Sequence, residues 1–131
     1  MKKEFTILIA DRNPHVRGFL KRELAAEGFI VIMADSAQDL LRWTFGQTPV
    51  DLLLIDPDLP DMESEALMER LNSRIPPIPV VIHTLPEERK KVNLHQDIVV
   101  YVEKGGHSIE QLKEVIHRVR SGKPTQALSE Q

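Results

Sequence analysis

The sequence predicts an α/β domain built on a doubly wound parallel sheet. Two observations carry this prediction: short runs rich in valine, isoleucine and leucine recur along the 131-residue chain, and segments with helical patterns separate them. Most runs are continuous instead of alternating with polar residues, which is typical of parallel strands buried on both faces. Alternation of strands and helices at this spacing indicates right-handed crossovers, with helices on both sides of one sheet.

The predicted strands are five apolar runs, at residues 5–10, 29–34, 51–55, 78–82 and 98–102. Five parallel strands in one small domain favour the flavodoxin-like (βα)5 arrangement with strand order 2-1-3-4-5. In that order the chain changes direction between the first and third strands, and ligands bind beyond the carboxyl ends of the strands at such a point.

Helices are predicted in the intervening segments, at residues 14–27, 36–45, 62–73, 86–96 and 108–120. Gly28 closes the first helix, and Ser36 followed by Asp39 resembles a capping box at the start of the second. Trp43 and Phe45 are expected to pack this second helix and not to bind a ligand. The segment 86–96 has few apolar anchors beside a run of charges, so we expect a short, exposed and mobile helix there.

The composition excludes several classes of protein. The chain has no cysteine, which excludes disulfides, thiolate metal sites and a cysteine nucleophile. Its net charge of −3 provides no basic surface for nucleic acid. The run 5–10 is too short for a signal peptide or a membrane span, so we expect a cytoplasmic protein without a membrane partner. One domain is expected over residues 1–121, with a flexible tail or linker at 122–131.

Chemically active side chains stand at the ends of four predicted strands. Asp11 follows the first strand, and Asp56 follows the third. Thr84 stands at the end of the fourth strand, and Lys104 at the end of the fifth. These strands are neighbours in the 2-1-3-4-5 order, so their carboxyl ends meet at one edge of the sheet. Two carboxylates, a hydroxyl and an ammonium group are therefore expected around one crevice.

Four motifs carry a resemblance to a known family. They are IADRNPHVR after the first strand, DLLLIDPDLPDM around the third, PVVIHT in the fourth and VVYVEKG in the fifth. In this order and spacing they resemble the receiver domains of bacterial two-component response regulators, of the chemotaxis-regulator type. The resemblance runs from about residue 4 to about residue 120.

The resemblance implies a phosphorylated switch. Asp56 would accept a phosphoryl group from a phosphohistidine on a partner, either a sensor histidine kinase or a phosphotransfer protein. Lys104 would contact that group, and Thr84 and Tyr101 would reorient when it arrives. Asp11 and Asp56 would bind Mg²⁺, and Asp58, through its backbone or side chain, or Asn13 would partly compensate for a missing acid. A downstream protein would bind the face made by the strand 98–102 and the helices 86–96 and 108–120.

Three positions depart from the family pattern. Arg12 stands where a second acid is usual after the first strand, and because an arginine repels Mg²⁺, weak metal binding is expected. Arg12 is either solvated or an internal cation paired with Asp56. Gly105 and Gly106 replace the usual proline after the lysine, which loosens that loop. Leu85 replaces a small residue after the switch hydroxyl, and its bulk would restrict access to the pocket.

The residues leave alternatives open. The same fold can serve as a pseudo-receiver, an interaction module that needs no phosphorylation, and Arg12 and Leu85 favour that reading. A homodimer is also open. The Asp56-Pro57-Asp58 segment resembles the D-x-D motif of haloacid-dehalogenase-type phosphatases, but it lies on the wrong strand and Leu59-Pro60 follow it, so we expect no enzyme. The histidines share no metal-binding spacing: they are His15, His83, His95, His107 and His117.

Overall fold

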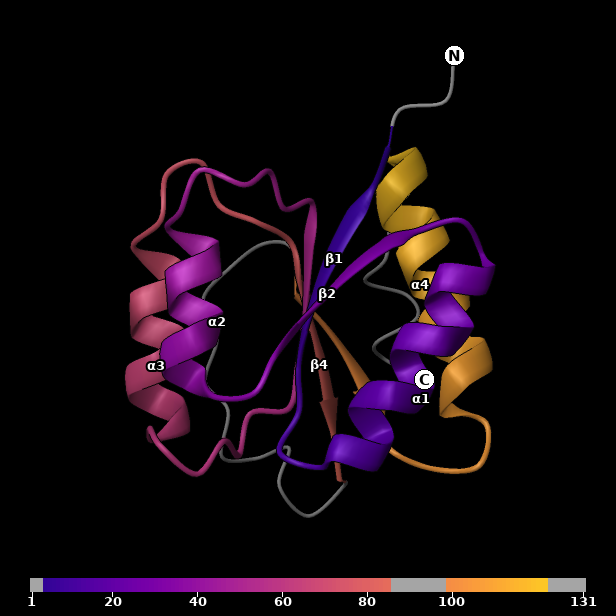
Figure 1. The fold of residues 1–131 in the computed structure, drawn as a ribbon, viewed down its shortest axis with the longest axis horizontal. Helices are drawn as coiled ribbons and strands as arrows, with labels where there is room; N and C mark the ends of the chain where they lie inside the picture. The colour runs from indigo at the N-terminus through magenta and orange to yellow at the C-terminus, as the bar shows by residue number, and fades with distance from the viewer. Residues whose placement is uncertain (1–3, 86–98, 123–131) are drawn as a thin grey trace.

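The computed structural model describes residues 4–85 and 99–122 (Figure 1). Its five strands form one parallel sheet in the order β2-β1-β3-β4-β5, which confirms the predicted fold class and strand order. The elements in chain order are β1 (Thr6–Ala10), α1 (Pro14–Ala26), β2 (Ile30–Ala34), α2 (Ala37–Thr44), β3 (Leu52–Ile55), α3 (Ser64–Asn72), β4 (Val80–Thr84), β5 (Val99–Glu103) and α4 (Ser108–Ser121). The expected helix at 86–96 and the tail from 123 onward lie outside the described residues.

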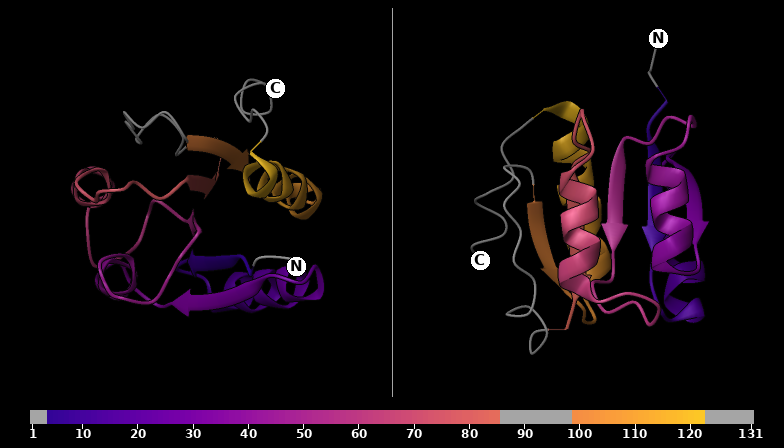
Figure 2. Two further views of the ribbon diagram at one scale, coloured as in Figure 1. Left: turned by 90° about the horizontal axis from the view of Figure 1, so that it is seen from above. Right: turned by 90° about the vertical axis from the view of Figure 1, so that its left-hand side faces the viewer.

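The helices cover the sheet in two pairs, so the domain has three layers. α1 and α4 lie on one face, and α2 and α3 lie on the other (Figures 1 and 2). Successive strand residues point to opposite faces, and the core is divided accordingly. Ile7 and Ile9 of β1 pack under α1 and α4, whereas Leu8 and Ala10 pack under α2 and α3.

The three inner strands and the edge strand β2 differ in the burial of their side chains. Every residue of β1, β3 and β4 is buried, as their continuous apolar runs predict. The prediction of burial on both faces is wrong for β2, where Ile30 is 41% exposed and Met33 is 39% exposed. β2 lies at the edge of the sheet, so it has only one neighbouring strand to cover it.

β4 begins two residues later than predicted, at Val80 and not at residue 78. Pro79 lies just before the strand and has no N–H to donate to the ladder. Its carbonyl oxygen still accepts a hydrogen bond from the N–H of Leu53 at 2.9 Å. β4 also ends two residues after the predicted run 78–82, so Thr84 is its last residue.

Side-chain caps begin the first two helices. Asn13 caps α1, because its Oδ1 atom accepts hydrogen bonds from the N–H groups of His15 and Val16. Pro14 is the first helical residue, which suits proline because that position needs no N–H. Ser36 caps α2 by accepting from the N–H of Asp39 at 3.0 Å, as the predicted capping signal requires.

A second cap on α2 comes from a distant loop. The carboxylate of Asp61 accepts hydrogen bonds from the N–H groups of Ala37 at 2.8 Å and Gln38 at 3.0 Å. These bonds lower the pKa of Asp61, the one from Ala37 most, although burial opposes them. The loop that follows Asp56 is thereby attached to the start of α2.

The aromatic residues of the second helix contact the protein itself. Trp43 is partly buried and packs against the core under α2 and α3, as expected. Phe45 is 45% exposed, and the guanidinium of Arg70 on α3 lies 5.8 Å from the centre of its ring.

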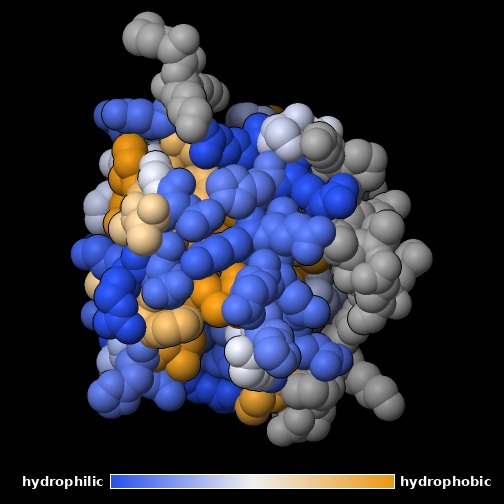
Figure 3. Space-filling model, turned by 90° about the vertical axis from the view of Figure 1, so that its right-hand side faces the viewer, coloured by the Kyte–Doolittle hydropathy of each residue, from blue (hydrophilic) through white to orange (hydrophobic). Residues whose placement is uncertain are grey.

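An ion pair and a histidine–carboxylate contact join α1 and its C-cap to α4 across the face shown in Figure 3, most of which is hydrophilic. The Nζ atom of Lys113 lies 3.1 Å from Glu23, and Nε2 of His117 lies 3.0 Å from Glu27. The contact with His117 is the main reason that the pKa of Glu27 is lowered. No helix in the described part of the chain is long and apolar enough to cross a membrane.

Candidate functional site

Three strands deliver charged side chains to one end of the sheet. Asp11 follows β1, Asp56 follows β3 and Lys104 follows β5. Backbone hydrogen bonds extend the ladder to these positions: the N–H of Asp56 donates to Ala10 at 2.7 Å, and the N–H of Lys104 donates to Thr84 at 2.8 Å. Asp11 and Asp56 are each 1% exposed, so both carboxylates are buried at the strand ends.

Lys104 connects the two buried carboxylates. Its Nζ atom lies 3.2 Å from Oδ2 of Asp11 and 3.5 Å from Oδ2 of Asp56. The Lys104 side chain is 15% exposed. Because one ammonium group reaches both oxygens, the structure brings together three of the four residues that the sequence placed around one crevice.

The carboxylate of Asp56 is enclosed by donors from two loops. Its Oδ1 atom accepts a hydrogen bond from the N–H of Asp58 at 3.1 Å. Its Oδ2 atom accepts from the backbone N–H of Arg12 at 3.3 Å and lies 3.2 Å from Nε of the same arginine. The Asp56 side chain is 0% exposed, so any reaction at its oxygens requires a neighbour to move.

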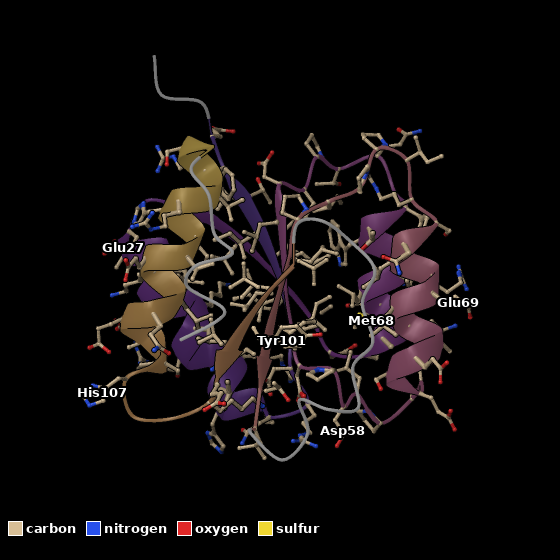
Figure 4. The ribbon with its side chains drawn as sticks, turned by 180° about the vertical axis from the view of Figure 1, so that it is seen from behind. Glu27, Asp58, Met68, Glu69, Tyr101 and His107 are labelled. Atoms are coloured by element: carbon tan, nitrogen blue, oxygen red, sulfur yellow. The ribbon has the colours of Figure 1, made fainter. Side chains whose placement is uncertain are left out.

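Arg12 also pairs with Asp58. Its Nη1 atom donates a hydrogen bond to Oδ2 of Asp58, whose side chain is 59% exposed and lies at the end of the sheet where the strands finish (Figure 4). The sequence left open whether Arg12 is solvated or an internal cation paired with Asp56. In the structure Arg12 is paired with Asp56, and Asp58 is its second partner.

Asp11 has one satisfied oxygen and one unsatisfied oxygen. Oδ1 accepts a hydrogen bond from the N–H of Asn13 at 2.9 Å. Oδ2 is buried and makes no conventional hydrogen bond in the described structure, although the ammonium group of Lys104 lies 3.2 Å away. Burial raises the pKa of Asp11, and the hydrogen bond from Asn13 and the charge of Lys104 only partly offset that effect.

The carboxylates do not form a ready magnesium site. Mg²⁺ requires oxygen ligands in near-octahedral geometry, and the unsatisfied Asp11 oxygen is one suitable ligand. Within residues 4–85 and 99–122, however, no group of three or more acidic or histidine side chains is placed to hold a metal ion. The guanidinium of Arg12 pairs with both Asp56 and Asp58, which are the other two predicted ligands. These residues as they stand do not fit Mg²⁺, and weak binding remains a prediction.

Thr84 and Tyr101 lie on the other face of the sheet from Lys104. Thr84 is fully buried, and its hydroxyl donates to the carbonyl of Leu85 at 3.3 Å. Tyr101 pairs in register with Ile82 and packs against the core under α2 and α3 (Figure 4). Their roles as switch residues remain predictions.

His83 is a site residue that the sequence analysis did not select. It is 4% exposed, and neither ring nitrogen has a hydrogen-bond partner among the described residues. Burial lowers its pKa to about 4, repulsion by Lys104 acts in the same direction, and Asp56 opposes both. It lines a cavity of about 290 Å³ together with Lys104 and the first turns of α1. Val81 lies in the core under α1 and α4. Because every second residue of a strand points to the same face, the sequence could have placed His83 on that face as well.

Comparison with known proteins agrees with this architecture. Residues 7–117 match the family described as response regulator receiver domain. The transcriptional regulator NtrC of Proteus hauseri is 30% identical over 78 residues, which are 60% of this chain and 16% of NtrC. The chain therefore spans about one sixth of the length of that relative.

Solved structures show the same fold. A RitR mutant superposes with a TM-score of 0.77 at 26% identity, covering 90% of this chain and 54% of RitR. The regulator TrrA of Thermotoga maritima, solved in complex with Mg²⁺ and BeF, has a TM-score of 0.71 at 21% identity, covering 88% of this chain and 98% of TrrA. The family match extends over most of the sequence and includes all five strands of the sheet. The chain therefore belongs to the response regulator receiver domain family.

Proposed function

We propose that Asp56 accepts a phosphoryl group from a phosphohistidine on a sensor histidine kinase or a phosphotransfer protein. The observation that carries the proposal is the buried Asp56 carboxylate with the Lys104 ammonium 3.5 Å from one oxygen. An oxygen of Asp56 would form a bond to phosphorus while the bond between phosphorus and the histidine nitrogen breaks. The imidazole leaves with the electron pair and takes up a proton. Lys104 would neutralise the charge on the transferred group, which is the main catalytic requirement of phosphoryl transfer.

The enclosure of Asp56 sets a condition on this reaction. Oδ2 is held by Arg12, and the side chain of Asp56 has no exposed surface. The Arg12 side chain is 33% exposed, so it is the neighbour with room to turn aside. Uptake of a phosphoryl group would therefore begin with movement of Arg12 away from Asp56.

Mg²⁺ is expected to bind this site only weakly. The similarity to TrrA, which was solved with Mg²⁺ and BeF, supports a related site in this chain. Asp11, Asp56 and Asp58 are the residues that would contact the ion. Because Arg12 pairs with two of them, the expected affinity is low.

The phosphoryl group would then change a protein-binding face. We expect Thr84 to turn its hydroxyl from Leu85 toward the new group and Tyr101 to follow. The face would consist of β5 and α4, together with the predicted helix 86–96, which lies outside the described residues. NtrC is described as DNA-binding, but this chain covers 16% of it and has a net charge of −3, so we expect a protein partner, in the cytoplasm, and no direct contact with nucleic acid.

Intact-mass measurement after incubation with acetyl phosphate tests the proposal. The wild type should gain the mass of one phosphoryl group, and Asp56→Asn should gain none. Glu69→Gln is the control, because it removes an exposed carboxylate of α3 outside the site and should still be labelled. Labelling that persists in Asp56→Asn, or a wild type that stays unlabelled, would remove Asp56 as the acceptor.

A second function, as a pseudo-receiver, is favoured by one specific observation. The ion pair between Arg12 and Asp56 already supplies the buried carboxylate with a counterion. In that case the domain would bind its partner without phosphorylation, and Asp56→Asn would leave partner binding unchanged. The same mass measurement discriminates, since a pseudo-receiver gives no adduct.

A further inference from the structure

We propose that Arg12 is a resident cation of the carboxylate site, and that Asp56 takes up a phosphoryl group there without a divalent metal. The inference rests on the function proposed above and concerns how the same site balances its charge. It accords with the weak Mg²⁺ binding expected above and assigns the charge that Mg²⁺ would supply to a cation that belongs to the chain.

Arg12 contacts both carboxylates of the loop after β3. Its Nε atom lies 3.2 Å from Oδ2 of Asp56, and its Nη1 atom donates to Oδ2 of Asp58. Its backbone N–H also donates to Asp56 at 3.3 Å. The Arg12 side chain is 33% exposed, and its two carboxylate partners hold the guanidinium at the mouth of the site.

In the described part of the chain, three positively charged side chains stand at the site: Arg12, Lys104 and Arg17, whose Nη1 atom donates to the backbone carbonyl of Asp11 at 2.7 Å. Arg12 and Lys104 stand beside the three carboxylates of Asp11, Asp56 and Asp58. An arginine in place of an acid changes the charge at position 12 from −1 to +1. That difference equals the charge that one divalent ion would bring to a site with the acid. Arg12 therefore supplies the positive charge that a divalent metal would supply in a site with an acid at position 12.

Arg12 also competes with a metal for the same oxygens. Mg²⁺ binds oxygen ligands at about 2.0–2.1 Å. A guanidinium has N–H donors and no free lone pair, so it occupies carboxylate oxygens but cannot itself serve as a metal ligand. Oδ2 of Asp56 already faces both Arg12 and Lys104. A metal could reach that oxygen only after Arg12 leaves, and it would still be repelled by Lys104.

The guanidinium suits the group that Asp56 would accept. Its planar set of donors fits two oxygens of a phosphoryl group at once, as it fits a carboxylate. With acetyl phosphate, an Asp56 oxygen forms the new bond to phosphorus, the bond between phosphorus and the acetate oxygen breaks, and acetate leaves with the electron pair. Arg12 exchanges the Asp56 oxygen for phosphoryl oxygens and stays protonated, so no oxidant, reductant or proton donor is needed.

Magnesium binding, measured by calorimetry, is the first test. Wild type, Arg12→Asp and Arg12→Gln are titrated with magnesium chloride, and thermal unfolding confirms that each is folded. Arg12→Asp should bind Mg²⁺ at least about tenfold more tightly than the wild type, which corresponds to about 1.4 kcal/mol. Lys21→Asp is the matched control, since it makes the same change of charge at an exposed position of α1. It should titrate like the wild type.

Labelling by acetyl phosphate is the second test, with magnesium chloride or with a chelator. The wild-type rate should be the same in both solutions, and Arg12→Gln should be slower than wild type in both. Arg12→Asp should lose at least about tenfold of its rate when magnesium is removed, in line with its new dependence on the ion.

The two tests separate failure of this inference from failure of the proposed function. A wild type that binds Mg²⁺ as tightly as Arg12→Asp, or that labels only with magnesium, overturns the resident cation. A wild type that is unlabelled in both solutions removes the phosphoryl acceptor, and with it metal-free uptake. In that case tighter Mg²⁺ binding by Arg12→Asp still supports Arg12 as the cation that fills the site.

Discussion

The Nζ atom of Lys104 lies 3.2 Å from Oδ2 of Asp11, although β5 and β1, the strands that carry them, are separated in the sheet by β3 and β4. The same ammonium group lies 3.5 Å from Oδ2 of Asp56, which follows β3, one of the two intervening strands. One long side chain thus spans the site and keeps two buried carboxylates from facing each other without a counterion. The site depends on this lysine for stability before any phosphoryl group arrives.

Replacing Lys104 by methionine should therefore destabilise the domain. The substitution keeps the apolar stem and removes the charge, which leaves Asp11 without its cation. Removing one partner of a buried ion pair costs about 3–5 kcal/mol. Because Arg12 still neutralises Asp56, we expect a loss at the lower end of that range, measured by urea unfolding at neutral pH. Lys113→Met removes a partly exposed pair with Glu23 and should cost less than about 1 kcal/mol; equal losses would contradict the argument.

Asp11→Asn should have the opposite effect at neutral pH. Burial raises the pKa of Asp11 above 3.8, so the folded chain binds a proton more readily than the unfolded chain. Stability therefore falls as pH rises through the raised pKa, and the charged carboxylate is a cost at neutral pH. An asparagine keeps an oxygen for the N–H of Asn13 and removes that charge. We expect Asp11→Asn to be more stable than the wild type at neutral pH, with the difference shrinking in acid.

Unfolding curves recorded across the acidic range test this expectation. Asp58→Asn is the control, because its carboxylate is 59% exposed and should show no comparable gain. An Asp11→Asn protein that is less stable than wild type at neutral pH would mean that the ion pair with Lys104 outweighs the cost of burial.

His83→Leu should remove a pH dependence of stability whose sign is opposite to that caused by Asp11. The pKa of His83 is lowered from 6.5 to about 4, so between these values the unfolded chain binds a proton that the folded chain does not. Stability therefore rises with pH across this window, by at most about 3 kcal/mol. The leucine variant should lose this slope and be more stable at acidic pH, since it also removes two buried nitrogens that have no partner in the described structure.

The control is His107→Leu, at an exposed position before α4 (Figure 4). It should keep the slope of the wild type in urea unfolding between about pH 4 and pH 7, the range in which histidines titrate. A slope that survives in His83→Leu would have to come from other groups.

The sheet was predictable from the sequence because each of its signals is local. Continuous apolar runs mark buried parallel strands, and they located β1, β3 and β4 to within two residues. The end of a strand is also a local feature, so Asp11, Asp56 and Lys104 followed once the strand order was known. The exposure of Ile30 and Met33 did not follow, because a run of apolar residues looks the same at the edge of a sheet as in its centre.

The second partner of Arg12 and the depth at which His83 is buried could not be read from the sequence. Arg12 and Asp58 are 46 positions apart, and whether a guanidinium bends inward depends on the geometry of two loops. Burial of His83 depends on how α1 and α4 cover the end of β4. Asp61 reaches α2 from 24 positions away, whereas the local cap Ser36 was evident from its spacing to Asp39. Long-range polar contacts were thus the part that required the structure.

Asp61→Ala should loosen the start of α2. The Asp61 carboxylate accepts from the N–H groups of Ala37 and Gln38, which have no partner within the helix. Loss of a capping side chain costs about 1 kcal/mol, and we expect that decrease in urea unfolding at neutral pH. Hydrogen exchange of the two amides should accelerate. Because these hydrogen bonds lower the pKa of Asp61 below 3.8, the contribution should be present above that pH and disappear as the solution becomes more acidic.

Two variants separate this distant cap from the local one. Asp61→Asn retains one acceptor oxygen and should lose only part of the stability. Ser36→Ala removes the bond to the N–H of Asp39 and should accelerate exchange of that amide, while Ala37 and Gln38 stay protected by Asp61. Since Asp61 lies in the loop that follows Asp56, loosening it should also alter how that loop holds the acceptor. Unchanged exchange at Ala37 and Gln38 in Asp61→Ala would show that water replaces the carboxylate without cost.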